Sequence, residues 1–136
     1  MKPSNITIPT QTSTAGFIWL KLSVLYLIVG VAMGIFMGAS HDFTLRPVHA
    51  HVNLLGFATL ALAGLIYSVF PDAGASRLAK AHFWLMNLAL PVMMVALGCM
   101  LLGKTAVLPA LVVSELMMAA AVLAFATNIF MNLRKD

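Results

Sequence analysis

Long apolar runs separated by short polar segments dominate the chain after its first residues. Four runs of about 20 residues or more cover residues 17–39, 48–70, 83–102 and 107–131. A helix of that length crosses the hydrocarbon core of a bilayer. The segments between the runs contain proline, glycine and charged residues, which is typical of turns. The pattern predicts an all-α integral membrane protein, a four-helix bundle formed by residues 16–136.

The residues that precede the first apolar run are polar and rich in threonine and serine. We predict that residues 1–15 form a polar N-terminal tail. The run that follows is longer than the apolar core of about 7–15 residues found in a secretory signal peptide. We therefore expect the first run to be retained as a membrane span.

Composition excludes several classes of protein. Of the 136 residues, 62% are hydrophobic and only 9% are charged, whereas soluble domains carry about 25% charged residues. This composition excludes a soluble globular domain, a disordered chain and a nucleic-acid-binding module. The single cysteine, Cys99, excludes an intrachain disulfide. The expected surroundings are a lipid bilayer, and no nucleic-acid partner is expected.

The eight lysines and arginines divide unequally between the two sides of the predicted bundle. The side that holds both termini carries six of them: Lys2, Lys21, Arg77, Lys80, Arg134 and Lys135. The other side carries Arg46 and Lys104. The positive-inside rule then predicts that both termini are cytoplasmic. The segment 41–53 is expected at the outer face, in a bacterial inner (cytoplasmic) membrane.

Three histidines, His41, His49 and His51, lie within eleven residues at the predicted outer end of the second helix. His49 and His51 are two residues apart, about 200° around a helix axis, and therefore point to nearly opposite sides. Imidazole is a good ligand for heme iron, copper or zinc. We predict that these three histidines are metal ligands and that Asn53, one turn after His49, is also a cofactor-binding residue. The alternative is that they bond water or loop carbonyls at the membrane boundary.

His82 lies immediately before the third apolar run, at the predicted inner end. Its vertical separation from His51 is roughly 20 Å, from the helical rise and the bilayer thickness. The two histidines therefore cannot hold one iron between them. His82 is either an interfacial anchor or part of a second, inner site.

Two charged residues accompany the predicted helices. Arg46 lies just before the second helix, where its guanidinium can bind a heme propionate or a lipid phosphate. Glu115 is the only acidic residue deep within an apolar run, and ionisable groups in a membrane are costly. It is a candidate for a proton relay, for a hydrogen bond to a cofactor, or for a structural hydrogen bond between helices.

Glycines recur every four residues on one face of the first helix. Gly30, Gly34 and Gly38 form two consecutive GxxxG steps, which allow another helix to approach closely. They serve either packing within the bundle or an interface between subunits.

The run from Arg46 to Gly56 resembles the catalytic-subunit family of heme-copper oxidases and nitric oxide reductases. Reductases of that family carry His-Thr-Asn-Leu-Leu on their second helix, and its histidine ligates low-spin heme b. His51-Val52-Asn53-Leu54-Leu55 is similar, which implies the same role for His51. The oxidases also have a His-x-His pair that serves two hemes, and His49-Ala50-His51 is similar to it. The resemblance implies the fold of one four-helix arc of subunit I, as in small subunit-I-like proteins.

The chain departs from that family in its histidine count. Its four histidines are too few for a low-spin heme, a high-spin heme and copper, and the family's His-His copper motif is absent. The resemblance therefore implies a homo-oligomer, with a trimer as the candidate. In that assembly hemes would lie between protomers, with His49 of one and His51 of the next as axial ligands.

The function expected from these features is that of a membrane b-type heme protein, a cytochrome b with histidine-ligated heme near the outer face. It would act in electron transfer or in the binding or reduction of a diatomic gas. If it is an enzyme, it is an oxidoreductase similar to the oxidases and reductases above. Heme b is the expected cofactor, copper is a further candidate, and the sequence does not identify the redox partner. The alternative is a non-catalytic small subunit or assembly factor that binds copper or zinc through the outer-face histidines.

Overall fold

The computed structural model describes residues 14–133, and these residues form helices without any strand. Four helical segments are long and apolar enough to cross a membrane: Gly16–Ser40, Arg46–Val69, Arg77–Leu101 and Thr105–Asn132. The prediction of an all-α chain with four such segments is confirmed. The predicted tail, residues 1–15, lies almost wholly outside the described residues.

The described residues form eight helical elements, seven in the four segments and one between the second and third segments. The first segment is α1 (Thr14–Ser40), and the second is a continuous run of α2 (Arg46–His51), η1 (Val52–Thr59) and α3 (Leu60–Val69). A short helix, α4 (Pro71–Ala75), leads into α5 (Arg77–Leu101). The last segment begins with η2 (Thr105–Val107) and continues as α6 (Leu108–Asn132).

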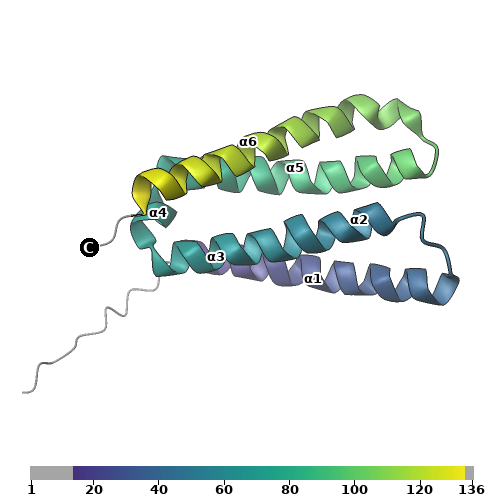
Figure 1. Cartoon of the computed structure of the whole chain (residues 1–136), viewed down its shortest axis with the longest axis horizontal. Helices are drawn as coiled ribbons and strands as arrows, with labels where there is room; N and C mark the ends of the chain where they lie inside the picture. The colour runs from purple at the N-terminus through teal and green to yellow at the C-terminus, as the bar shows by residue number, and fades with distance from the viewer. Residues whose placement is uncertain (1–13, 134–136) are drawn as a thin grey trace, which may run out of the picture.

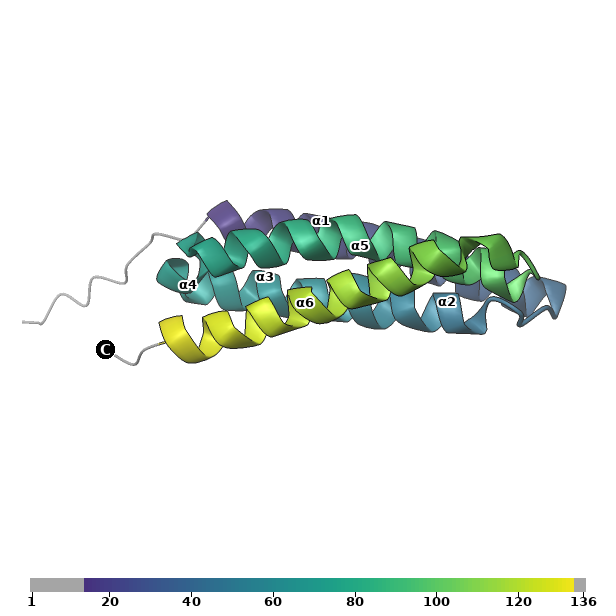
Figure 2. The ribbon, with the colours of Figure 1, turned by 90° about the horizontal axis from the view of Figure 1, so that it is seen from above.

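The helices pack as two antiparallel hairpins, as Figure 1 shows. One hairpin pairs α1 with the second segment, and the other pairs α5 with α6. The hairpins meet where α2 and η1 contact α5, and again where α4 contacts α1, α5 and α6. Figure 2 shows that all four long helices run nearly along one axis. The end that holds α2 is called the outer end below, after the predicted topology, and the end that holds α4 is called the inner end.

Large side chains fill the space between the two hairpins. Leu60, Met86 and Leu90 are fully buried there. At the inner end, Trp19 of α1 in one hairpin packs against Phe83 of α5 in the other, with ring centroids 5.3 Å apart. Burial of apolar and aromatic surface therefore joins the hairpins where their backbones do not touch.

Two predicted boundaries need correction at the inner end. The third long helix begins at Arg77 rather than at residue 83, because Ser76 caps it: the Ala79 amide donates to the Ser76 hydroxyl oxygen, 2.9 Å away. Charged residues in the first turns of α5 do not belong to an apolar run, so the run underestimates the helix. The preceding segment was expected to be a turn, but Pro71 begins the short helix α4.

Candidate functional site

A short, ordered loop carries the chain from α1 to the histidines of α2. The Thr44 hydroxyl and amide donate to Asp42, at 2.7 and 2.9 Å. Both bonds lower the pKa of the Asp42 carboxyl below its usual value, and the bond from the Thr44 hydroxyl has the larger effect. The loop therefore keeps these bonds at neutral pH and loses them as the pH falls through the lowered pKa. The helix α2 then begins at Arg46, with Pro47 in its first turn.

His49 points into the first hairpin, toward α1. Its Nδ1 lies 3.0 Å from the Gly30 carbonyl oxygen. A carbonyl oxygen only accepts hydrogen bonds, so Nδ1 carries the proton and Nε2 carries the lone pair. An alanine at position 34 would place its Cβ 3.1 Å from Cε1 of His49. The ring is therefore packed directly against the glycine face of α1.

His51 points away from the bundle. Its side chain is exposed, and its Nδ1 lies 2.7 Å from the Pro47 carbonyl oxygen in the preceding turn. By the same argument Nδ1 is the donor and Nε2 carries the lone pair. Leu54 and Leu62 are also exposed along the same segment. His51 therefore presents a ring nitrogen with a lone pair on an otherwise apolar outward surface.

Asn53 hydrogen-bonds to His49 rather than to His51. Its Nδ2 donates to the His49 carbonyl oxygen at 2.9 Å and lies 3.4 Å from Nδ1 of the His49 ring. The amide also fills the space beside Gly30, where a Cβ would overlap it. The glycine face of α1 thus serves packing within the bundle at Gly30 and Gly34. Gly38 has nothing within 4 Å of an added Cβ.

Substituting Gly30 with alanine is expected to lower the free energy of unfolding by about 1–3 kcal/mol, because the new methyl group displaces the Asn53 amide. The matched control is Gly38→Ala, where the methyl group meets open space and should be tolerated. The measurement is denaturant unfolding in detergent, followed by circular dichroism. Equal stability of the two variants would contradict the packing described for Asn53.

A π-helix begins immediately after His51. It covers Val52–Thr59, and the Thr59 hydroxyl donates to the Leu54 carbonyl oxygen five residues earlier, at 2.8 Å. The wide turn brings Gly56 against the ring of Tyr26, where an added Cβ would lie 2.6 Å from the ring atoms. π-Helical turns are rare and are frequent at functional sites. The sequence patterns did not predict this element.

Among residues 14–133, no group of three or more His, Cys, Asp or Glu side chains could hold one metal ion. His41 is exposed in the loop, with a left-handed backbone (φ 53°). His49 faces the bundle interior and His51 faces outward. The structure therefore does not assemble the three predicted histidine ligands into one site. Instead, the three imidazole rings lie apart from one another.

Arg46 and Glu115 are both on the surface. Arg46 is exposed at the start of α2, with its guanidinium carbon 5.4 Å from the centre of the Phe43 ring. Glu115 is exposed on α6, whereas its neighbour Ser114 is buried and donates to the Leu111 carbonyl oxygen. A relay or helix-to-helix hydrogen bond inside one bundle therefore does not fit the position of Glu115.

His82 lies in the core of the bundle, with 1% of its surface exposed, so its ring is not presented to the surroundings as that of an exposed interfacial anchor would be. Its ring lies between those of Trp19 and Phe125, at centroid distances of 4.5 and 4.9 Å. The Tyr67 hydroxyl lies 3.0 Å from its Nδ1. Asn128 donates to that hydroxyl oxygen at 3.3 Å, so the phenol proton is directed at Nδ1. The Nε2 of His82 has no hydrogen-bond partner among the described residues. Sequence reasoning missed this buried cluster.

Comparisons of the chain with models of protein families, with curated proteins and with solved structures find no match. The resemblance to the heme-copper oxidase family therefore rests on sequence motifs of the chain, residues 46–56 and, more weakly, residues 82–84. Function has to be argued from the positions of the side chains themselves.

Proposed function

We propose that the protein is a membrane b-type heme protein in which His51 is an axial ligand at the outer face. The observation that carries this proposal is the bond between His51 Nδ1 and the Pro47 carbonyl oxygen, 2.7 Å long. Histidines that bind metals commonly donate their second ring N–H to a carbonyl, which fixes the tautomer and the ring orientation. His51 has that arrangement, and its exposed position leaves room for a planar macrocycle.

Arg46 and Pro47 complete the proposed site from the same helix. The Pro47 carbonyl oxygen orients the ring, and the exposed Arg46 guanidinium is available to a propionate carboxylate. His49 is held by Gly30 on the inner side of the helix, so it cannot share one iron with His51 of the same chain. A second axial ligand would come from a neighbouring copy, which makes a homo-oligomer, with a trimer as the candidate, part of the proposal.

The number of axial ligands decides the reaction class. Iron bound by two imidazoles is suited to electron transfer, and iron with one free axial position binds diatomic gases. For electron transfer and for gas binding alike, His51 would bind the iron, the Pro47 carbonyl oxygen would orient the imidazole ring, and Arg46 would neutralise a propionate charge. An oxidoreductase activity would require the iron with one free axial position. The proposed place is the outer face of a bacterial inner membrane, with both termini cytoplasmic.

A titration of hemin into the detergent-purified protein tests the proposal. We expect a saturable shift of the Soret band, with parallel titrations of Zn²⁺ and Cu²⁺ giving no stoichiometric binding. Stoichiometric zinc or copper binding without a heme shift would contradict the heme proposal. It would favour the small metal-binding subunit instead.

Glu115 provides a test of the proposed oligomer. A carboxyl that faces outward within an apolar helix is costly unless a neighbour receives it, so we infer that it lies between copies. Glu115→Leu is expected to weaken association about five- to tenfold, the effect of losing roughly one hydrogen bond within a membrane. Glu115→Gln, which keeps the hydrogen-bonding capacity, is the matched control.

Native mass spectrometry from detergent measures the subunit distribution of the three proteins. A wild-type protein that is monomeric with a full complement of heme would reject the site between subunits. An unchanged distribution in Glu115→Leu would remove Glu115 from the interface.

A further inference from the structure

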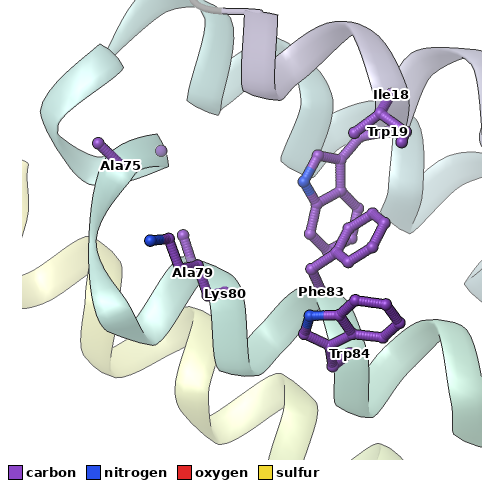
Figure 3. Close-up of a pocket in the computed structure, with 8 residues that line it drawn as sticks. Ile18, Trp19, Ala75, Ala79, Lys80, Phe83 and Trp84 are labelled. Atoms are coloured by element: carbon purple, nitrogen blue, oxygen red, sulfur yellow. The ribbon is translucent and has the colours of Figure 1, made fainter.

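A pocket of about 380 Å³ opens at the inner end of the bundle, beside α1, α4 and α5. Figure 3 shows its aromatic side, formed by Trp19, Phe83 and Trp84. Lys80 and the small residues Ala75 and Ala79 line the remainder. The pocket lies at the opposite end of the bundle from α2, which carries His51 (Figure 1). It therefore belongs to a different site from the proposed heme ligand.

The polar groups of this pocket are hydrogen-bond donors. The indole nitrogen of Trp19 and the amine of Lys80 border the same open space in Figure 3. Only 2% of the surface of Trp19 is exposed, and its indole N–H donates no hydrogen bond to another described residue. Indole N–H and ammonium groups donate and do not accept. The pocket is therefore built for a ligand with acceptor oxygens.

The position of the pocket favours a ligand from the membrane. Lys80 lies one turn after Arg77 at the inner end, where Lys21 of α1 is also exposed. The predicted topology places this end in the cytoplasmic leaflet, which is rich in anionic lipids, and basic pockets between membrane helices there bind lipid headgroups. Tryptophans and lysines are also enriched at this depth.

We propose that the pocket binds the headgroup phosphate of an anionic phospholipid. The Trp19 N–H and the Lys80 ammonium donate to phosphate oxygens, while Phe83 and Trp84 contact the glycerol and the upper acyl chains. A zwitterionic lipid fits less well, because its cationic group would be placed beside Lys80 and no carboxylate lines the pocket. The proposal does not depend on heme binding.

Tryptophan fluorescence reports on this pocket directly, because the two tryptophans of the chain both line it. The heme-free protein is reconstituted in phosphatidylcholine vesicles that contain increasing mole fractions of phosphatidylglycerol with brominated acyl chains. Bromine quenches nearby indoles. We expect half-maximal quenching at a several-fold lower mole fraction of this lipid than of brominated phosphatidylcholine.

Substituting Lys80 with glutamine is expected to raise the half-maximal mole fraction of brominated phosphatidylglycerol about five-fold, the effect of one cation near an anionic surface. Lys104→Gln, at the other end of the bundle, is the matched control and should leave the curve unchanged. Lys80 is exposed, and circular dichroism together with unchanged quenching by brominated phosphatidylcholine verifies that the variant is folded.

Three results would overturn the proposal. Equal quenching by the two brominated lipids would show that the pocket does not recognise an anionic headgroup. Equal effects of Lys80→Gln and Lys104→Gln would show that the preference for phosphatidylglycerol comes from the overall charge of the protein and not from the pocket. Reversal of the quenching by inorganic phosphate at constant ionic strength would assign the pocket to a free anion instead of a lipid.

Discussion

Replacement of His51 with alanine is expected to abolish heme binding, so that the Soret shift on hemin addition is lost. The outward imidazole is held by the Pro47 carbonyl oxygen, 2.7 Å from its Nδ1, and its Nε2 is the nitrogen that we propose as the iron ligand. We expect at least a ten-fold loss of heme affinity, because loss of even a supporting partner of a metal ligand costs about 10–100-fold. Absorption spectroscopy during hemin titration measures the change.

His41→Ala is the control for that substitution. His41 lies in the exposed loop before α2 and is not required by the proposed site, so this variant should retain the wild-type spectrum. An unchanged spectrum in His51→Ala would remove His51 as the ligand. A loss of the spectrum in both variants would show that the ligand set includes the loop.

Replacement of Asn128 with alanine is expected to lower the free energy of unfolding by about 2–3 kcal/mol. This fully buried amide donates to the Ala73 carbonyl oxygen at 2.9 Å and accepts a bond of 2.7 Å from the Ser76 hydroxyl. It also donates to the Tyr67 hydroxyl. One side chain of α6 therefore bonds to polar groups on α3, on α4 and at the cap of α5, and its loss removes one hydrogen bond from each of them. Denaturant unfolding in detergent measures the effect.

Asn87→Ala is the matched control, because within residues 14–133 the Asn87 side chain bonds only to the Phe83 carbonyl oxygen of its own helix, at 2.8 Å. It should cost much less than Asn128→Ala. Equal stability losses in the two variants would contradict the role of Asn128 as the link between the two hairpins.

The apolar runs were sufficient to predict the four long helices, because the length of a run reports the length available to cross a bilayer. They could not locate the start of α5. That helix begins at Arg77, where the Ser76 side chain caps it. The cap is a local hydrogen bond, so hydropathy does not reveal it. The π-helix after His51 was also missed, since its wide turn changes the hydrogen-bonding register without changing the composition.

The candidate site was predictable only in part. The two-residue spacing of His49 and His51 predicted their different directions, because helix geometry fixes the angle between neighbours. The outward direction of Glu115 and the burial of His82 were not predictable, because contacts between helices decide them. Trp19 and Phe125 enclose His82 from α1 and α6, and one sequence does not show which helix faces meet.

The pyridine hemochrome spectrum of the purified protein, combined with its metal analysis, tests the central claim most directly. Protein expressed with adequate heme should be red and should yield the spectrum of heme b, with iron bound in proportion to the chain. Well-folded protein that is colourless and free of iron under the same conditions would contradict the assignment of His51 as a heme ligand.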